Sequence, residues 1–467
     1  MIESNQDTIC AISTPLGVGG VGIVRLSGNQ SLSFLKKCFT FKSTVTPRYV
    51  YQGQFYSHAN KRFIDSVCVV YFQGPASYTG EDVVEIHCHS SVYILKSVMQ
   101  EFISLGARIA KEGEFTKRAF IHGKLDLTQA ESVIDLIHSE TEASHRVSLA
   151  HVNGVLMDFI QSIRSPIKEI LEQVEGSMDF PDEVDAIDRK KTYHIVAGIF
   201  DRLKDVLSYQ DVGELVMGGV NVLIVGRPNV GKSSLFNMLL GKDRAIVSDI
   251  PGTTRDYLEA TFEFKGYRFN LFDSAGFRHS DDQIEQLGIE RISSLLDRAH
   301  VICWCVDQSD QFNADDNSVY EAIKSHHNVL VFKTKSDLDS KLILNKHITF
   351  PSYPISVYNK DLTTQIKSIF YEHTVHVSES VNLDLLCNIR QKACLDQLEQ
   401  WFLNFLTDLD SVKDDDLLAI DLKRGLEICS EFSGDSLTEE VLDGIFSRFC
   451  VNLGSYLKTG VVCILLK

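Results

Sequence analysis

The sequence predicts a multidomain α/β protein: an N-terminal α+β module, then a discontinuous helical domain into which a doubly wound α/β domain is inserted. Its 467 residues are enough for about three domains of ordinary size. Valine-rich runs separated by turns dominate the first part of the chain. Farther on, apolar residues recur at helical spacing on both sides of a central block of continuous apolar runs, and such runs are typical of buried parallel strands.

The composition is that of a globular protein, with 44% hydrophobic and 23% charged residues. The formal net charge is −17, whereas a protein that binds nucleic acid only by neutralising phosphate should be basic. There is neither an apolar run long enough for a bilayer nor a secretory signal pattern. Because the 11 cysteines are scattered without a CxxC pair, we expect free thiols and a cytoplasmic location without membrane contact.

We expect the N-terminal module at residues 1–122. Apolar, valine-rich runs predict strands at 8–12, 21–26, 65–72 and 82–87, and a glycine-rich turn separates the first two. Some helical sequence lies between these strands, so the module is assigned to the α+β class.

The hydrophobic period changes near the end of this module. Apolar residues three and four positions apart mark one helical face: Leu127, Ala130, Ile134 and Ile137. Thr128 and Glu131 fit a capping box at the start of this helix. We therefore expect the first part of the helical domain at 123–218, with a break at 179–182.

The central block, 219–378, is expected to be the inserted doubly wound domain. Continuous apolar runs predict buried parallel strands at 220–225, 301–306 and 329–332. The second part of the helical domain is expected at 379–467. Its apolar face is marked by residues at alternating spacings of three and four: Leu395, Leu398, Phe402, Phe405 and Leu409.

The segment Gly226–Ser233 matches the phosphate-loop pattern GxxxxGK[ST], follows a predicted strand and precedes an apolar helix, as the motif requires. Its backbone N–H groups are expected to cradle phosphate, Lys232 to face the β- and γ-phosphates, and Ser233 to coordinate Mg²⁺. The residues expected to contact the nucleotide here are Asn229, Val230, Gly231, Lys232, Ser233 and Ser234.

Two shorter motifs favour GTP over ATP. Asp273 and Gly276 follow the apolar run 269–272, where a carboxylate can hold the Mg²⁺ shell and a glycine can sense the γ-phosphate. The residues resembling the guanine-reading [NT]KxD motif are Thr334, Lys335 and Asp337. The aspartate can accept from the N–H groups of guanine, a donor pair that adenine lacks. The nearest candidate for a further guanine-contacting pair is Ser356-Val357.

A switch loop is predicted at 248–256, where Thr254 is placed to complete Mg²⁺ coordination. Phe277 occupies the position at which many GTPases carry a water-orienting glutamine, so another residue must hold the water. Asn229 is a candidate K⁺ ligand because an amide carbonyl suits this ion, and it could equally be a turn residue.

The sequence resembles the MnmE (TrmE) family of tRNA modification GTPases over essentially the whole chain. The segments that carry the resemblance are 14–28, 77–85, 113–120, 123–131, 226–256 and 273–289. The resemblance implies a tetrahydrofolate-binding N-terminal module that also mediates homodimerisation. It implies an FAD-dependent MnmG-type partner in a heterotetramer, and modification of carbon 5 of the wobble uridine of certain tRNAs.

The reaction implied by the resemblance adds an aminomethyl or carboxymethylaminomethyl group, with the one-carbon unit supplied by formyl- or methylene-tetrahydrofolate. GTP hydrolysis would need Mg²⁺, K⁺ and dimerisation of the GTPase domains. The tRNA would be held mostly by the partner, which fits the acidic charge of this chain. A regulatory GTPase switch in ribosome assembly is the alternative, and the N-terminal motifs argue against it.

The resemblance also assigns roles to individual residues. The K⁺ site would comprise Asn229, Ser248, Ile250 and Thr253, and Mg²⁺ would be held by Ser233 and Thr254. The switch residues Ser248, Thr253 and Thr254 would also contact GTP. Glu285 would be the catalytic, water-orienting residue, and the folate contacts would be Arg25, Glu85 and Lys124. The alternatives are a solvated helix face for Glu285 and plain surface charge for Arg25 and Lys124.

This chain departs from the family pattern in three places. Ser90-Ser91 replaces two glycines of the family's CHGG turn, and Glu112 stands where the family has proline in PGEF. The family usually ends FC[IV]GK, whereas here Cys450-Val451 is followed by Asn452-Leu453 and further residues. The terminal lysine that contacts folate in the family therefore has no equivalent at that spacing.

Overall fold

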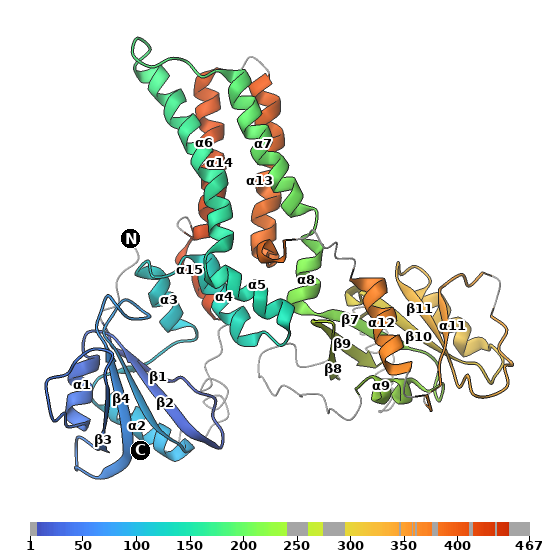
Figure 1. Ribbon diagram of the computed structural model, residues 1–467, viewed down its shortest axis with the longest axis horizontal. Coiled ribbons are helices and arrows are strands. Elements are labelled where there is room, and N and C mark those ends of the chain that lie inside the picture. Colours follow the sequence, from blue (N-terminus) through green and yellow to red (C-terminus); the bar gives the residue numbers. More distant parts are fainter. Residues whose placement is uncertain are drawn as a thin grey trace. The chain divides into compact units, whose positions relative to one another are not determined.

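The computed structural model describes residues 7–240, 260–273, 295–344, 347–356, 358–359, 362–375, 382–410, 414–434 and 437–447 (Figure 1). The chain forms two compact units. The first contains Met1–Ile134, Val152–Lys168 and Ile420–Lys467, and the second contains Asp135–His151 and Glu169–Ala419. Among the described residues, none of the helices combines the length and the apolar character that a membrane crossing needs.

The first unit contains a mixed six-stranded sheet with the order β3-β4-β5-β2-β1-β6. Its strands are β1 (Ile9–Ile12), β2 (Gly19–Ser27), β3 (Val50–Tyr56), β4 (Phe63–Phe72), β5 (Val83–Ser90) and β6 (Arg108–Ile109). All neighbours are antiparallel except β1 and β6. The four predicted strands are confirmed. The edge strand β3 was not predicted, because its polar residues and Gly53 hide the strand pattern.

The two faces of this sheet differ in chemistry. Val24 and Ile86 lie on the face that packs against helices α1 (Ser31–Cys38) and α2 (Val92–Ser104), and both are fully buried. Side chains alternate across a strand, so the intervening residues Arg25 and Glu85 lie on the opposite face. Both are partly exposed there, near helix α3 (Glu114–Ile121).

Long helices make up the predicted helical regions. They are α4 (Leu127–His138), α5 (Glu142–Val152), α6 (Val155–Asp179), α7 (Arg189–Leu207), α8 (Asp211–Gly218), α13 (Ile389–Asp410), α14 (Asp415–Ser433) and α15 (Glu439–Phe446), with a 3-10 turn at Leu383–Leu385. The predicted break is confirmed between α6 and α7. Asp188 caps α7 by accepting hydrogen bonds from the backbone N–H groups of Lys190 and Lys191.

The predicted apolar face of α13 is confirmed, since its five marker residues are all buried. Helices α7 and α13 run side by side (Figure 1). Phe200 and Phe402 stack between them with ring centroids 5.4 Å apart.

The predicted cap of α4 was wrong by two residues. The helix begins at Leu127, and the preceding Asp126 accepts a hydrogen bond from the N–H of Gln129 while the Gln129 side chain accepts from the N–H of Asp126. This reciprocal pair is the capping box. Thr128 lies inside the first turn and donates its hydroxyl proton to Asp126. The expected face also ends early, because Ile137 is 71% exposed.

The second unit contains the predicted doubly wound domain, with sheet order β12-β11-β10-β7-β9-β8. Its strands are β7 (Val220–Val225), β8 (Ala260–Phe264), β9 (Tyr267–Asp273), β10 (Val301–Asp307), β11 (Val329–Thr334) and β12 (Ser352–Pro354). Every neighbouring pair is parallel except β8 and β9. The carboxyl ends of the parallel strands therefore lie along one edge, where doubly wound sheets bind ligands.

Helices cover both faces of this sheet. Helices α9 (Lys232–Leu240) and α12 (Leu362–Thr374) pack on one face, and α11 (Ala314–Ile323) packs on the other. Strand β10 contributes Cys303 and Cys305 to the first core and Trp304 to the second, and all three are fully buried. This burial on both faces explains why the parallel strands are continuous apolar runs.

Candidate functional site

The loop between β7 and α9 has the backbone of a phosphate-binding turn. Gly226, Asn229 and Gly231 have φ angles of 150°, 62° and 101°. A Cβ atom on Gly226 would clash with the carbonyl oxygen of Cys305, so only glycine fits there. Asparagine is among the few other residues that tolerate the left-handed region. Asn229 is thus a turn residue, and it is also exposed, which leaves its amide accessible to a ligand.

The lysine of this loop is held by main-chain carbonyl groups. Lys232 is 7% exposed, and its Nζ donates to the carbonyl oxygens of Gly226 and Arg227 at 2.9 Å each. Ser233 and Ser234 are exposed in the first turn of α9. Unpaired backbone N–H groups at a helix start attract anions, and the lysine adds a positive charge beside them. The arrangement is suited to binding phosphate.

A second loop follows strand β11, which is separated from β7 by β10 in the sheet. Asp337 is exposed, and its Oδ1 accepts a hydrogen bond of 2.6 Å from the hydroxyl of Ser356. The backbone N–H of Ser336 donates to the carbonyl of Ile355 at 3.1 Å, which joins the two loops again. Lys335 has a φ of 55° and pairs with Asp307 at the end of β10. The structure thus brings Ser356, the candidate for a further guanine contact, against Asp337.

Charged residues beneath these loops are paired. Burial tends to raise the pKa of Asp307, but hydrogen bonds from Lys335 and Ser309 bring the pKa below its ordinary value. Arg227 of the phosphate loop lies 2.7 Å from Asp310 and 3.2 Å from Asp316 of the α11 region. Asp316 is fully buried, and this burial raises the pKa of its carboxyl group.

Several predicted nucleotide and metal ligands lie outside the described residues. They are Ser248, Ile250, Thr253, Thr254, Gly276 and Glu285, together with the C-terminal segment from Cys450 onward. Asp273 is described only as the last residue of β9. Strand β9 is parallel to β7 and next to it, so Asp273 lies at the carboxyl end of a parallel strand.

In the first unit, Arg25 and Glu85 face each other across β2 and β5. The Nη2 and Nε atoms of Arg25 lie 2.8 Å and 2.9 Å from Oε1 of Glu85. The other carboxylate oxygen lies 3.2 Å from Nε2 of His87. The ring of Phe115, from α3, lies 5.8 Å from the guanidinium carbon of Arg25, within cation–π range. The cluster offers a charged pair beside an aromatic ring.

Lys124 contacts the loop between β4 and β5. It is exposed, and its Nζ donates to the carbonyl oxygen of Pro75 at 3.1 Å. The loop containing Pro75 also carries Tyr78, whose hydroxyl lies 3.0 Å from the hydroxyl of Thr116 on α3. Burial raises the pKa of Tyr78, so this phenol is neutral at physiological pH.

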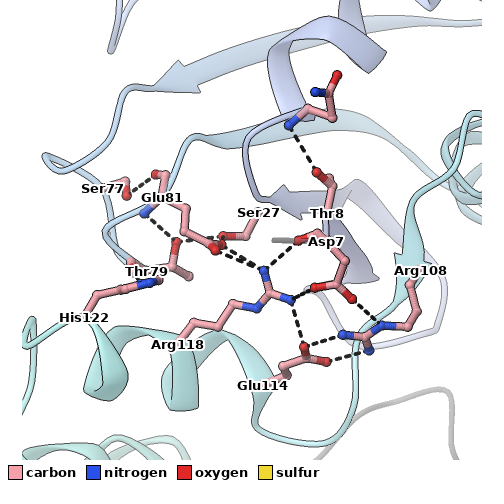
Figure 2. A network of polar contacts seen from close by, with 11 residues as sticks. Asp7, Thr8, Ser27, Ser77, Thr79, Glu81, Arg108, Glu114, Arg118 and His122 are labelled. Atoms are coloured by element: carbon pink, nitrogen blue, oxygen red, sulfur yellow. Dashed lines mark hydrogen bonds and ion pairs between the residues drawn. The ribbon is translucent and has the colours of Figure 1, made fainter. Parts of the chain in front are cut away.

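Several motif residues of the first unit, with Asp7 and Arg108, form a polar cluster centred on the buried Arg118 (Figure 2). We call it the Arg118 network. Its members are Asp7, Ser27, Thr79, Glu81, Arg108, Glu114 and Arg118. Arg118 is 5% exposed, and its guanidinium bonds Glu81 at 3.1 Å, Glu114 at 3.0 Å and Asp7 at 2.6 Å. The network links Asp7, the loop before β5 and helix α3.

Two acids of this network, Glu114 and Asp7, have lowered pKa values. Burial tends to raise the pKa of Glu114, but hydrogen bonds from Arg108, the N–H of Lys111 and Arg118 bring the pKa below its ordinary value. The pKa of Asp7 is lowered in the same way, since the bonds from Arg108 and Arg118 outweigh burial. Both carboxylates are bonded to Arg108 and Arg118 of the same network, which indicates a structural role.

Comparison with known protein families decides the identity. The model described as "GTP-binding protein TrmE N-terminus" matches residues 8–124, and the model "MnmE helical domain" matches 127–450, more than half of the chain. The chain belongs to the MnmE family of tRNA modification GTPases. It therefore contains a TrmE-type N-terminal domain, the MnmE helical domain and a P-loop GTPase domain, which confirms the predicted fold class and enzyme class.

Relatives match along nearly the whole MnmE chain. The "tRNA modification GTPase MnmE" of Thermotoga sp. (strain RQ2) is 36% identical over 458 residues, covering 96% of this chain and 100% of the relative. The protein of the same name from Aquifex aeolicus (strain VF5) is 36% identical over 450 residues, covering 96% and 99%. The G domain of the Thermotoga maritima FeoB iron transporter is 27% identical, covering 33% of this chain and 98% of that chain, with a TM-score of 0.26.

Sequence reasoning missed two groups of residues in this MnmE-family chain. All members of the Arg118 network except Asp7 and Arg108 lie within the motifs that carry the family resemblance, but motif membership alone does not separate ligand contacts from structural pairs. One signal was available, since Glu114 and Arg118 have the i, i+4 spacing of a helical ion pair. The contacts of Arg227 with Asp310 and Asp316 had no sequence signal, because they join the phosphate loop to another strand connection.

Proposed function

We propose that this MnmE-family GTPase, with an FAD-dependent MnmG-type partner, adds an aminomethyl or carboxymethylaminomethyl group to carbon 5 of the wobble uridine of certain tRNAs. One observation carries the proposal: a phosphate loop after β7 and a guanine-type loop after β11 lie at the same edge of one sheet, in a chain whose N-terminal domain is of the TrmE type. A GTPase acting only in ribosome assembly would not need that N-terminal domain. This argues against the alternative.

Nucleotide binding is assigned to the two loops. Lys232 neutralises the β- and γ-phosphates, and the N–H groups of Gly231 and the start of α9 hold them. Asp337 accepts from the guanine N–H groups, and Ser356 fixes the orientation of that carboxylate. The switch segment supplies Ser248, Thr253 and Thr254, and Asp273 and Gly276 lie on the γ-phosphate side.

The residues at the phosphate loop also fit two cations. The exposed hydroxyl of Ser233 and the exposed amide oxygen of Asn229 are hard oxygen donors. Ser233 and Thr254 would hold Mg²⁺, and Asn229, Ser248, Ile250 and Thr253 would hold K⁺. Bound there, the cations would offset charge that develops on the phosphate oxygens. Glu285 orients the attacking water, a task that Phe277 cannot perform.

A K⁺ requirement can be tested directly. Hydrolysis should rise steeply when Na⁺ is replaced by K⁺, because a cage of oxygens fitted to K⁺ holds Na⁺ poorly. Asn229→Ala should reduce this rise while GDP affinity is retained. Equal rates of the unmodified protein in the two salts would contradict the K⁺ assignment.

The N-terminal domain is proposed to bind formyl- or methylene-tetrahydrofolate and to mediate homodimerisation. Arg25 and Lys124 would contact the anionic part of the cofactor, and Glu85 the donors of its pterin ring. Because Arg25 and Glu85 already pair, binding must either use them as a neutral pair or separate them. The tRNA would be held mostly by the MnmG-type partner, since this chain carries a net charge of −17.

The decisive experiment is tRNA nucleoside analysis after deletion of the gene. The modified wobble uridine should disappear and should return when the unmodified protein is supplied. Lys232→Ala and Glu285→Ala should not restore it, while Lys341→Ala, a change of an exposed lysine in the same domain, should. Normal modification in the deletion strain, or restoration by Lys232→Ala, would overturn the proposed function.

A further inference from the structure

The first residue of the guanine-type loop, Thr334, is attached to the phosphate loop. It is the last residue of β11 and is 4% exposed. Its hydroxyl donates to the carbonyl oxygen of Val230 in the phosphate loop and lies 3.2 Å from the carbonyl oxygen of Val306 at the end of β10. The Thr334 side chain also lies next to Gly231. A Cβ atom placed on that glycine would be 3.6 Å from Cβ of Thr334.

The hydroxyl has only one proton to donate. Both of its neighbours in the protein are carbonyl oxygens, which accept hydrogen bonds and cannot donate them. Whichever carbonyl receives the proton, the hydroxyl has only lone pairs left for any third group. Thr334 can therefore offer a bound base an acceptor but no donor.

Guanine presents N7 and O6 as acceptors on one edge. An asparagine at position 334 would carry two N–H donors, one for the carbonyl of Val230 and one for N7. Asp337 cannot replace the missing donor, because an ionised carboxylate only accepts. Neither side chain can therefore donate a hydrogen bond to N7.

We propose that this chain binds guanine nucleotides without a side-chain hydrogen bond to N7, because the Thr334 hydroxyl is used to fasten the phosphate loop to the base-binding loop. Discrimination between bases then falls on Asp337, held by Ser356, and its contact with the base N–H donors. The inference rests on the guanine site of the proposed function.

The test is competition binding of three diphosphates to the full-length protein: GDP, 7-deaza-GDP, in which N7 is replaced by a C–H group, and IDP, which lacks the 2-amino group. The unmodified protein should bind 7-deaza-GDP within about twofold of GDP, because no hydrogen bond is lost. IDP should bind about tenfold or more weakly, because a hydrogen bond to the Asp337 carboxylate is lost. A preference for GDP over 7-deaza-GDP of about fivefold or more would overturn the proposal.

Two variants identify the residue responsible. Thr334→Asn should gain a preference for GDP over 7-deaza-GDP of about 2- to 12-fold, the range of one ordinary hydrogen bond. Thr334→Val should weaken GDP and 7-deaza-GDP by the same factor, because it removes the bond to the phosphate loop without altering the reading of N7. If Thr334→Asn gained no preference for GDP over 7-deaza-GDP, the role of this position would be overturned. If that variant did not fold, the measurement on the unmodified protein would still decide whether N7 receives a hydrogen bond.

The outcomes also separate this proposal from the proposed function. Failure to bind GDP, or equal affinity for GDP and IDP, would remove the guanine site itself. Tight GDP binding with rejection of both IDP and 7-deaza-GDP would leave the GTPase assignment intact and overturn only the inference about N7.

Discussion

The two regions that carry family motifs use them differently. In the GTPase domain, the motif residues Asn229, Ser233 and Asp337 are exposed at strand ends, and their positions are set by the backbone. In the N-terminal domain, Glu114 and Arg118 are buried and are bonded mainly to one another and to other charged groups. A motif residue is therefore a candidate ligand contact when its polar atoms remain accessible, and a structural residue when partners in the protein use them.

Desolvation explains the difference. A charge removed from water must be compensated by the protein, and the Arg118 network does so with several ion pairs. Lys232 is an intermediate case, since it is buried and its Nζ donates to the carbonyl oxygens of Gly226 and Arg227. The Arg118 guanidinium, by contrast, faces three carboxylates.

The largest expected effect is the loss of the buried guanidinium. Arg118→Met should lower the free energy of unfolding of the N-terminal domain by about 3–5 kcal/mol, because Glu81 and Asp7 lose a buried cationic partner. Hydrogen exchange of peptides within residues 8–121 measures this, and Arg62→Met, at an exposed position, is the control. Wild-type exchange in the Arg118 variant would return this residue to the candidate ligand contacts.

In the phosphate loop, we expect a substitution to impair GTP hydrolysis and to leave the stability of the N-terminal domain unchanged. Lys232→Ala should reduce single-turnover GTP hydrolysis by about 10²–10³-fold, the usual loss when one positive or donor group at a reacting anion is removed. Hydrogen exchange in the N-terminal domain should not change. A variant that hydrolysed GTP at the normal rate would show that the buried lysine only supports the loop backbone.

Sequence reasoning predicted the elements with strong periodicity. The strands β7, β10 and β11 and the apolar face of α13 were predicted because each is buried over its length and has few polar interruptions. Strand β3 and the Asp126 cap were missed, since an edge strand tolerates polar residues and two candidate caps lay two residues apart.

The candidate sites also contain a part that sequence reasoning predicted and a part that it missed. The phosphate and guanine loops were predicted because each motif lies on contiguous residues after a strand, so sequence spacing fixes their geometry. The pairing of Ser356 with Asp337 and of Arg227 with Asp316 depends on which strands become neighbours. No local spacing encodes such contacts. For the same reason, the Arg118 network could not be separated from ligand contacts before the fold was known.

Acid should destabilise the N-terminal region more than the GTPase domain. The folded-state pKa values of Asp7 and Glu114 are below their ordinary values of 3.8 and 4.5. Their stabilising contribution is present above those ordinary values and is lost as the pH falls through the folded-state pKa values. In the GTPase domain, Asp307 has a lowered pKa and acts in the same direction, whereas Asp316 has a raised pKa. The free energy of unfolding gains from Asp316 as the pH falls through its folded-state pKa, which offsets the loss from Asp307.

Hydrogen exchange between about pH 6 and pH 3, corrected for the intrinsic rate, would measure this contrast. Protection of residues 8–121 should fall more steeply than protection of 301–334. Arg118→Met should flatten the fall in the first region, because Asp7 and Glu114 lose one source of their lowered pKa values. An equal fall in both regions, unchanged in the variant, would contradict the assignment of acid sensitivity to the Arg118 network.

The smallest expected effect concerns Ser356, which contacts Asp337 from another loop. Ser356 is 8% exposed and donates a 2.6 Å hydrogen bond to Oδ1 of Asp337.

Ser356→Ala should weaken GDP binding by about 2- to 12-fold, the range of one net hydrogen bond, because the carboxylate loses the group that orients it. It should also reduce the preference for GDP over IDP, since a mobile carboxylate reads the 2-amino group less well. The rate of hydrolysis at saturating GTP should remain normal, because Asp337 is assigned to the base and not to the phosphates. Competition binding with Ser340→Ala, an exposed serine nearby, as the control would measure the change. A normal preference for GDP over IDP in Ser356→Ala would show that Asp337 is oriented by its own loop, and the guanine loop would then depend on local sequence as fully as the phosphate loop does.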